Sequence, residues 1–344
     1  MLNGEPKNII VRMPNWVGDL VMATPVLYDL KQKFPEASIT AMAKEPLCSL
    51  LKKDKNINEL FCFKKQKNIF LRRRENKNII ENLREGLYDL GVLLTNSFSS
   101  AWLFSQGKVK NTIGYKKDFR ALLLDTSMPF SREKEHLVIK YKQLLKPLGI
   151  ENTKSRPKLY LDDKEIKQTK ELLYQRGFSD GNTLIGINPL AQYGSAKCWP
   201  LDRFKEVAIR LTQDENNRVV FLGDNSSKDI IKKLFSDMPK NIINLSGRTT
   251  LRELSCIIHE CDLFLTNDSG PMHIAAAFDI PELALFGSTT QNLTGPYSEK
   301  AHIINKNVKC SPCFKRTCPI DFKCMQEIQV DEVMDQLLKI LKNA

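Results

Sequence analysis

The chain has 344 residues, of which 42% are hydrophobic, and a formal net charge of +12. A chain of this length is longer than a single hydrophobic core usually serves, so two domains of roughly 150 to 170 residues each are expected. The longest apolar runs fall far short of the roughly 20 residues that a membrane-spanning helix needs, so no transmembrane segment is predicted. Residues 1–6 include Glu5 and lack the basic-then-apolar pattern of a secretory signal, so we expect a cytoplasmic protein.

The positive charge is concentrated in the first half of the chain. Residues 1–160 contain 29 Lys and Arg against 16 Asp and Glu, a net charge of +13, whereas residues 161–344 contain 23 against 24, a net charge of −1. This asymmetry indicates an acidic partner for the first half, such as nucleic acid, an anionic membrane surface or a phosphorylated substrate. The alternative is that the charge serves solubility alone.

The first half alternates between strand-like and helix-like segments. An apolar strand at residues 8–13 leads through a turn into an amphipathic helix that ends near Lys33. Four more strands are expected, at residues 38–43, 60–63, 89–94 and 112–115. This alternation is typical of a parallel sheet covered by helices on both faces, and we assign residues 1–160 to such a Rossmann-like domain.

The second half restarts the same alternation after a polar linker at residues 151–157. Five strands are expected, at residues 184–188, 219–223, 242–245, 263–266 and 283–286. We assign residues 161–329 to a second doubly wound domain and expect the helical segment 330–344 to pack back on the first. Two such domains in tandem predict a ligand-binding cleft between the carboxyl ends of their strands.

The first chemical motif follows the first strand and reads Asn15-Trp16-Val17-Gly18-Asp19. Exposed backbone N–H groups in a first helical turn stabilise a charged carboxylate, so Asp19 could accept a proton near neutral pH. The alternative is that Asp19 only caps the helix.

Two further motifs follow strands of the second half. Tyr193, Gly194 and Lys197 lie in the first, where glycine permits close approach of a ligand and lysine can meet a phosphate. Residues 268–273 form the second, at a helix start that offers amide donors to an anion. Its members are Asp268, Ser269, Gly270, Pro271, Met272 and His273. The alternatives are a solvated lysine and a structural histidine.

Taken together, the three motifs resemble those of the ADP-heptose:lipopolysaccharide heptosyltransferases of glycosyltransferase family 9. The resemblance runs from Ile9 to about Leu341 and is strongest for members that add the second heptose. Its markers are residues 15–19, Lys197-Cys198-Trp199-Pro200 and residues 266–270. It implies a GT-B fold with two Rossmann-like domains, and inverting transfer of L-glycero-D-manno-heptose from ADP-heptose to heptosyl-Kdo-lipid A.

The resemblance also implies roles for individual residues. Asp19 matches the catalytic base, Lys197 the donor-phosphate lysine, and residues 268–273 the loop that holds the donor, with Tyr193 and Gly194 beside it. The acceptor is expected at Asn15, Trp16 and the basic clusters of the first half, which would also contact the inner face of the cytoplasmic membrane. These clusters are Lys64-Lys65 and Arg72-Arg73-Arg74. A solvated charged face is their alternative. The family's glutamate after Gly223 is not evident here, which leaves the nucleoside contacts open.

No cofactor is expected, although use of a divalent cation such as Mg²⁺ stays open. Nine cysteines in a cytosolic chain are expected to be reduced thiols. Four of them, Cys310, Cys313, Cys318 and Cys324, are spaced so that they could bind zinc, although structural use is favoured and no metal ligand is assigned.

Other functions remain open on sequence alone. A nucleic-acid-binding protein would fit the basic half, but it leaves Asp19 and Lys197 unexplained, so no nucleic-acid partner is assigned. Transfer of the first or a later heptose, or nucleotide-sugar epimerisation, would fit the same scaffold.

Overall fold

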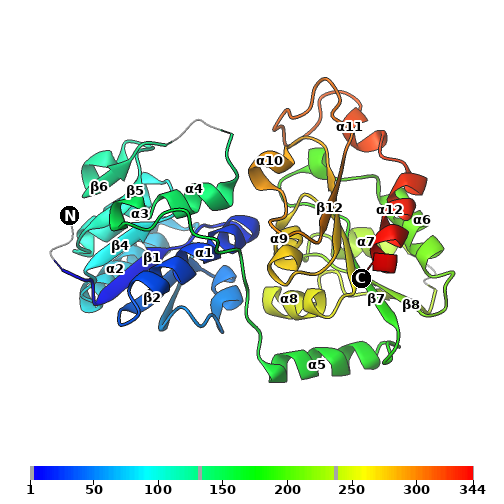
Figure 1. Cartoon of the computed structure of the whole chain (residues 1–344), viewed down its shortest axis with the longest axis horizontal. Coiled ribbons are helices and arrows are strands. Elements are labelled where there is room, and N and C mark those ends of the chain that lie inside the picture. The colour runs from blue at the N-terminus through cyan, green and yellow to red at the C-terminus, as the bar shows by residue number, and fades with distance from the viewer. Residues whose placement is uncertain (1–3, 131–133, 236–238, 344) are drawn as a thin grey trace. The chain divides into compact units, whose positions relative to one another are not determined.

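The computed structural model describes residues 4–130, 134–235 and 239–343. The chain divides into two compact units, unit 1 with residues 1–160 and unit 2 with residues 161–344. Each unit contains one six-stranded sheet in which every pair of neighbouring strands is parallel (Figure 1). This confirms the predicted α/β class with two doubly wound sheets.

Unit 1 arranges its sheet in the order β3-β2-β1-β4-β5-β6. Its elements, with short 3₁₀ helices labelled η, are β1 (Asn8–Arg12), α1 (Val17–Lys33), β2 (Ser38–Lys44), η1 (Leu47–Leu51), β3 (Glu59–Phe63), α2 (Ile69–Glu85), β4 (Leu90–Leu93), α3 (Phe98–Gln106), β5 (Thr112–Tyr115), η2 (Arg120–Leu123), β6 (Thr126–Met128), α4 (Leu137–Gln143) and η3 (Lys146–Leu148). The central strands β1 and β4 read as continuous apolar runs because helices cover both of their faces.

Unit 2 arranges its sheet in the order β12-β11-β10-β7-β8-β9. Its elements are α5 (Asp163–Tyr174), β7 (Thr183–Asn188), η4 (Ser195–Lys197), α6 (Leu201–Leu211), β8 (Asn217–Phe221), α7 (Lys228–Leu234), β9 (Ile242–Asn244), α8 (Leu251–His259), β10 (Leu263–Asn267), α9 (Gly270–Ala277), β11 (Glu282–Phe286), α10 (Gln291–Thr294), β12 (Ala301–Asn305), α11 (Lys323–Gln326) and α12 (Val330–Asn343). Capping boxes fix the starts of α5 and α8.

All ten predicted strands are present within one or two residues of their expected bounds, but two strands were missed. Strand β6 has three residues and none is buried, and strand β12 has only one buried residue. Both lie at the edge of a sheet, where one neighbour is absent and an apolar run is not needed. An exposed edge strand therefore lacks the pattern by which a buried strand is recognised.

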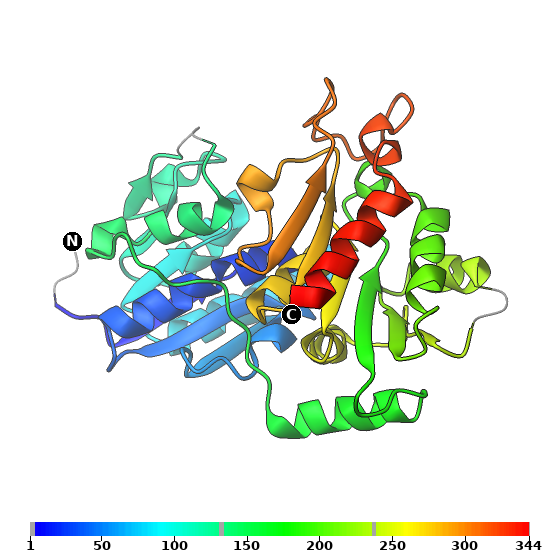
Figure 2. The same cartoon turned by 45° about the vertical axis from the view of Figure 1, so that its right-hand side comes forward.

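The C-terminal helix α12 packs within unit 2. Its apolar face, with Val330, Val333, Leu337 and Ile340, is buried in the core of unit 2, and Figure 2 shows the helix alongside the sheet of that unit. The packing of residues 330–344 on the first domain stays a prediction.

Among the described residues, none of the helices combines the length and the apolar character needed to cross a membrane.

Candidate active site

Each sheet has one point at which the strand order reverses direction, and the sequence motifs lie at these points. In unit 1 the chain leaves β1 toward β2 on one side, while β4 lies on the other side. In unit 2 the equivalent neighbours are β7 and β10. Loops that leave such a pair of strands diverge and form the ligand-binding crevice of doubly wound sheets.

The carboxylate of Asp19 lies in the first turn of α1, directly after β1. The N-cap of this helix is Trp16, so Asp19 is not the capping residue. Burial, together with the charge of Asp19 and the presence of Tyr115, raises the pKa of Tyr141 well above its usual value. Tyr141 belongs to α4, which packs against α1. Asp19 is therefore a half-buried carboxylate close to a phenol whose pKa is raised.

A buried arginine positions the residues before Asp19. The guanidinium of Arg12 donates a 2.8 Å hydrogen bond to the side-chain carbonyl of Asn15 and lies 4.5 Å from the ring centroid of Phe63. Burial lowers the pKa of Arg12 to about 9, so the group is still a cation at neutral pH. Trp16, next in the chain, is 52% exposed. Asn15 is thus held in place, whereas the indole of Trp16 is open to solvent.

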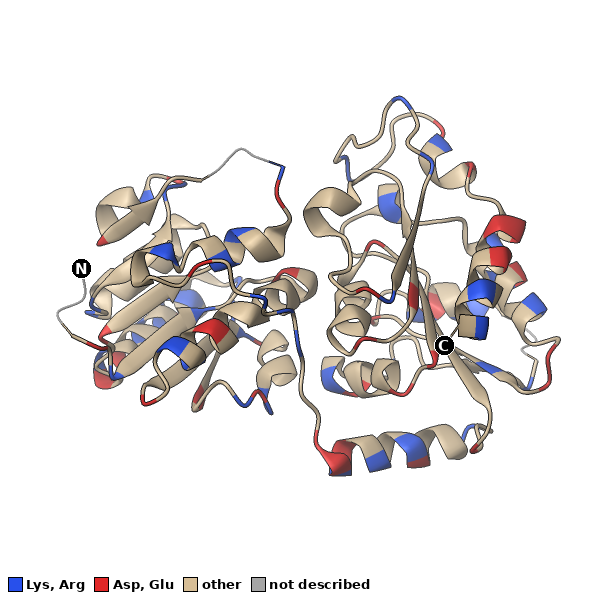
Figure 3. Ribbon diagram, viewed as in Figure 1, with Lys and Arg blue, Asp and Glu red and all other residues tan. Residues whose placement is uncertain are grey.

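The predicted basic clusters lie beyond the end of β3, and Figure 3 shows further Lys and Arg positions along the ribbon of unit 1. The backbone N–H of Lys64 donates a 2.8 Å hydrogen bond to Glu75, and its ammonium lies 3.7 Å from Glu45. Lys65 and residues 72–74 (Arg72, Arg73 and Arg74) are exposed. Cation density is therefore high at this end of the sheet, and the acceptor role of these residues stays a prediction.

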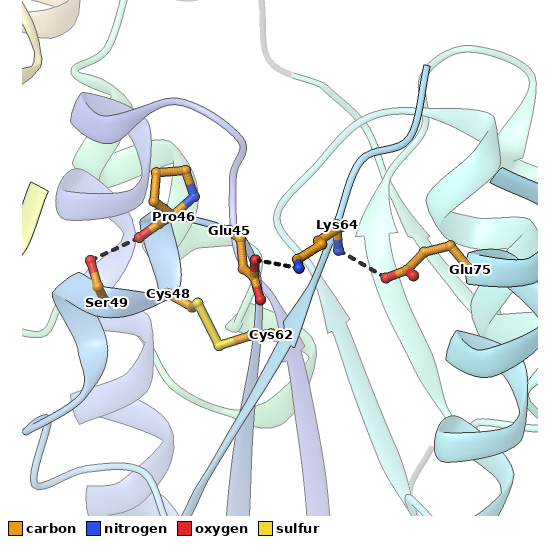
Figure 4. Close-up of a disulfide and its surroundings, with 7 residues drawn as sticks. All are labelled: Glu45, Pro46, Cys48, Ser49, Cys62, Lys64 and Glu75. Carbon is orange, nitrogen blue, oxygen red and sulfur yellow. Dashed lines mark hydrogen bonds and ion pairs between the residues drawn. A yellow bond between two sulfur atoms is a disulfide. The ribbon is translucent and has the colours of Figure 1, made fainter. Parts of the chain in front are cut away.

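The expectation that all cysteines are reduced is wrong for one pair. Cys48 in η1 and Cys62 in β3 form a disulfide, with their Cα atoms 5.9 Å apart (Figure 4). The pairing was missed because the two cysteines are separated by 14 positions, and only the fold of η1 against β3 brings them together. The disulfide fixes the strand end that carries Lys64.

In unit 2, the loop after β7 is fixed against the segment that contains Arg316. Gly194 has φ 152°, and a Cβ atom there would lie 2.2 Å from the carbonyl oxygen of Arg316, so only glycine fits. The backbone N–H of Ala196 donates to that oxygen at 3.0 Å. Tyr193 donates its hydroxyl hydrogen to the carbonyl of Phe314 at 2.7 Å. These contacts hold the predicted donor loop in one conformation.

Lys197 pairs with Asp268, which joins the loops after β7 and β10. The two side chains are 12% and 4% exposed, so the pair is largely withdrawn from water. The hydroxyl of Thr289 donates a second hydrogen bond to the Asp268 carboxylate. The ammonium of Lys197 also lies 4.8 Å from the ring centroid of Tyr193. The structure thus brings together three residues that the sequence assigned to the donor: Tyr193, Lys197 and Asp268.

The remaining predicted donor residues form the start of α9. Ser269 is the N-cap and its side chain makes no capping hydrogen bond in the described structure. Gly270 and Pro271 follow as the first helical positions, where proline costs no hydrogen bond. Met272 is fully buried against Ala284 and Phe286, so its side chain belongs to the core of unit 2. His273 is 5% exposed.

Three side chains of these sites were not predicted from the sequence. Arg12 was counted only as part of the apolar first strand. Thr289 follows β11, and no motif was recognised after that strand. Arg316 lies in the cysteine-rich segment, and its guanidinium is 5.4 Å from the ring centroid of Tyr193. The order of strands in the sheet could have pointed to Thr289, because β11 is the neighbour of β10.

The cysteine-rich segment brings its thiols close together without forming a recognisable metal site. Burial, with the nearby thiols of Cys310, Cys318 and Cys313, raises the pKa of Cys324. In the part of the chain that the structure describes, no group of three or more His, Cys, Asp or Glu side chains is arranged to hold a metal. Zinc binding by these cysteines stays an untested alternative.

Comparison with known proteins agrees with the motif analysis. Residues 77–323 match the family described as glycosyltransferase family 9 (heptosyltransferase). The chain is 29% identical over 343 residues to lipooligosaccharide heptosyltransferase 2 of Campylobacter jejuni, covering 98% of this chain and 99% of that one. It is 31% identical over 305 residues to lipopolysaccharide heptosyltransferase 2 of Salmonella typhimurium, covering 86% and 87%. The solved structure of the ADP-heptose lps heptosyltransferase II of E. coli superposes with a TM-score of 0.84 at 27% identity, covering 98% and 99%.

Proposed function

The chain belongs to glycosyltransferase family 9, and from that premise we propose that it transfers L-glycero-D-manno-heptose from ADP-heptose to heptosyl-Kdo-lipid A. It is a glycosyltransferase with the GT-B type of fold, built from two parallel six-stranded sheets. We propose transfer of the second heptose because the Campylobacter and Salmonella relatives are named heptosyltransferase 2. Transfer of the first or a later heptose is the alternative that the experiments below would reveal.

The observation that carries the proposal is the ion pair between Lys197 and Asp268 beside the start of α9. A diphosphate needs cations and amide donors, and both are present where the loops after β7 and β10 diverge. On donor binding, the ammonium of Lys197 would meet the diphosphate, and the carboxylate of Asp268 keeps that ammonium oriented. Arg316 would supply a second cation, through its position over the ring of Tyr193.

In the reaction, the acceptor hydroxyl oxygen attacks the anomeric carbon of the heptose while the bond from that carbon to the diphosphate oxygen breaks. The hydroxyl proton passes to the carboxylate of Asp19, and ADP leaves with the electron pair. Attack from the side opposite the leaving group inverts the anomeric configuration. The transition state is oxocarbenium-like, so stabilisation of the departing diphosphate by Lys197 and the amides of α9 supplies much of the rate effect.

The base assignment is tested by Asp19→Asn. This change removes the proton acceptor and preserves the shape of the side chain, so we expect transfer to fall by at least about a thousandfold. ADP affinity, measured by calorimetry, should stay near that of the wild type, because the donor residues lie in unit 2. Retention of most transfer activity by the variant would remove Asp19 from this role.

The acceptor is tested by comparing transfer from ADP-heptose to unheptosylated and to mono-heptosylated Kdo-lipid A. Activity on the mono-heptosylated acceptor alone is expected. A preference for the unheptosylated acceptor would instead identify transfer of the first heptose. No transfer to either, with ADP still bound, would point to another acceptor within the same family.

We also propose that the enzyme works in the cytoplasm at the inner face of the cytoplasmic membrane. Support comes from the net charge of +13 in residues 1–160 and from the exposed cations that follow β3. Anionic headgroups attract basic side chains by about 1 kcal/mol each close to the surface. Association of the protein with anionic vesicles should therefore weaken as salt concentration rises.

A further inference from the structure

Among the exposed large apolar side chains of unit 1, five lie in two short segments. In the first turn of α2, Ile69, Phe70 and Leu71 are 49%, 75% and 50% exposed. In the turn around η2, Phe119 and Leu122 are each 96% exposed. We call these five residues the apolar rim. Exposed aromatic and leucine side chains in such a group are unfavourable in water and typically mark an interaction surface.

The first part of the apolar rim lies at the same edge of the sheet as Asp19, and the second part lies in the connection that leads from that edge back to the start of β6. The first part follows β3 and the second follows β5, while Asp19 follows β1. Because all strands are parallel, their carboxyl ends share one edge, and the strand order places β1 between β3 and β5. The first part therefore lies to one side of the loop of the proposed base. In the second part, Leu122 is three residues before Asp125, whose carboxylate accepts a hydrogen bond from the backbone N–H of Thr112 at the start of β5.

The structure holds each part of the apolar rim outward. Helix α2 buries only Ile79 and Leu83, so its first turns extend beyond the core. Ahead of α2, Lys64 and the disulfide fix the end of β3 (Figure 4). In the second part, Arg120 is fully buried and donates to the backbone carbonyls of Tyr115 and Thr95. Phe119 adopts a left-handed φ of 58°, an uncommon conformation for a bulky residue.

Cations surround the exposed apolar side chains. Residues 64–74 contain six Lys and Arg and no acidic residue, and the second part is preceded by Lys116 and Lys117, with Asp118 as its acid. Apolar side chains that protrude from a basic surface match the two layers of an anionic bilayer. The cations meet the headgroup phosphates, and the apolar groups reach the acyl boundary below.

We propose that the apolar rim inserts into an anionic phospholipid bilayer and so places the base of unit 1 at the membrane surface. The inference rests on the proposed function, since an acceptor anchored by lipid A is presented at such a surface. Insertion of the apolar rim adds an apolar contact, which does not depend on charge, to the electrostatic attraction. Salt should therefore weaken the binding without abolishing it, because the apolar contribution is not screened.

The test uses the full chain and vesicles of phosphatidylethanolamine with phosphatidylglycerol, followed by co-sedimentation. Phe70→Ser with Leu71→Ser, and separately Phe119→Ser with Leu122→Ser, should each weaken binding by at least about tenfold. The matched control is Leu87→Ser. Leu87 is 73% exposed in the same unit, but it precedes β4 and lies at the opposite edge of the sheet. Its replacement should leave vesicle binding unchanged.

Insertion is measured directly with Phe70→Trp and vesicles that carry brominated acyl chains. Quenching of the fluorescence of the introduced indole, beyond the quenching seen with the wild type, is expected, and Leu87→Trp should show no such excess. Wild-type affinity in both double variants, or equal loss in Leu87→Ser, would overturn the proposal. So would a change from dimer to monomer in the double variants without vesicles, because the apolar rim would then join two copies of the chain.

The outcome is separable from the proposed function. Vesicle binding needs neither donor nor acceptor, and transfer to an acceptor dispersed in detergent needs no bilayer. We expect the two double variants to keep wild-type transfer rates on dispersed acceptor. Loss of heptosyl transfer in every assay, with vesicle insertion intact, would contradict the enzyme assignment alone.

Discussion

The ion pair between Lys197 and Asp268 offers the sharpest test of the donor site. Lys197→Met removes the ammonium and keeps an unbranched chain of similar length. The Asp268 side chain is only 4% exposed, so its carboxylate would lose its cation in a place where water cannot replace it. Breaking a buried pair from one side costs about 3 to 5 kcal/mol of unfolding free energy. Because Thr289 still donates to the carboxylate, we expect about 3 kcal/mol.

The double variant Lys197→Met/Asp268→Asn separates stability from function. With both charges absent, no buried ion is left unpaired, and unfolding free energy should return to within about 1 kcal/mol of the wild type. ADP affinity should not return, because the cation that meets the diphosphate is missing. Calorimetry with ADP measures this difference directly.

Urea denaturation measures the stabilities, and unit 2 can be followed by itself. The chain has three tryptophans, and Trp199 is the one that lies in unit 2, buried in its core. In a background where Trp16 and Trp102 are replaced by Phe, its fluorescence reports unfolding of unit 2. The matched control is Lys323→Met, which breaks the exposed pair with Glu327. That change should cost no more than about 0.5 kcal/mol.

Two results would refute this reasoning. One is a Lys197→Met variant that is as stable as the wild type, which would show that the carboxylate does not depend on the ammonium. The other is a double variant whose loss equals the sum of the two single losses, since that would leave no coupling between the side chains.

Three further predictions concern stability. Gly194→Ala should lower the unfolding free energy by about 1 to 3 kcal/mol and weaken ADP binding, because the added Cβ would collide with the carbonyl of Arg316. Urea denaturation measures the stability and calorimetry measures the ADP affinity. Unchanged values would contradict the steric requirement at this position. Glu282 is fully buried, and burial raises its pKa well above the usual value. The free energy of unfolding should therefore fall by up to about 1.4 kcal/mol per pH unit as pH rises from about 4.3 toward the pKa of Glu282 in the folded state. Glu282→Gln should remove that slope in urea denaturation from pH 5 to 8, and an unchanged slope would contradict the assignment. Cys62→Ser should lower the free energy of unfolding by about 3 kcal/mol under oxidising conditions, through loss of the bond to Cys48, and should leave it unchanged in excess reductant. Melting curves of variant and wild type that coincide in both conditions would argue against the bond.

The sequence by itself determined the elements that carry the chemistry. Continuous apolar runs identified the buried parallel strands, because such strands are covered on both faces and need no polar side chains. Since ligands bind where parallel strands end, the residues directly after those runs are the predicted site residues. Asp19, Lys197 and Asp268 were all found in this way, and the residue types in each motif pointed to the family.

The tertiary structure decided which side chains meet. The ion pair of Lys197 with Asp268 joins residues 71 positions apart, and it exists because β7 and β10 are neighbours in the sheet. The contact of Gly194 with Arg316 and the disulfide of Cys48 likewise depend on loops that fold against strands from elsewhere in the chain. No local pattern encodes such pairings, because hydrophobic periodicity reports which face of an element is buried and not what is packed against it.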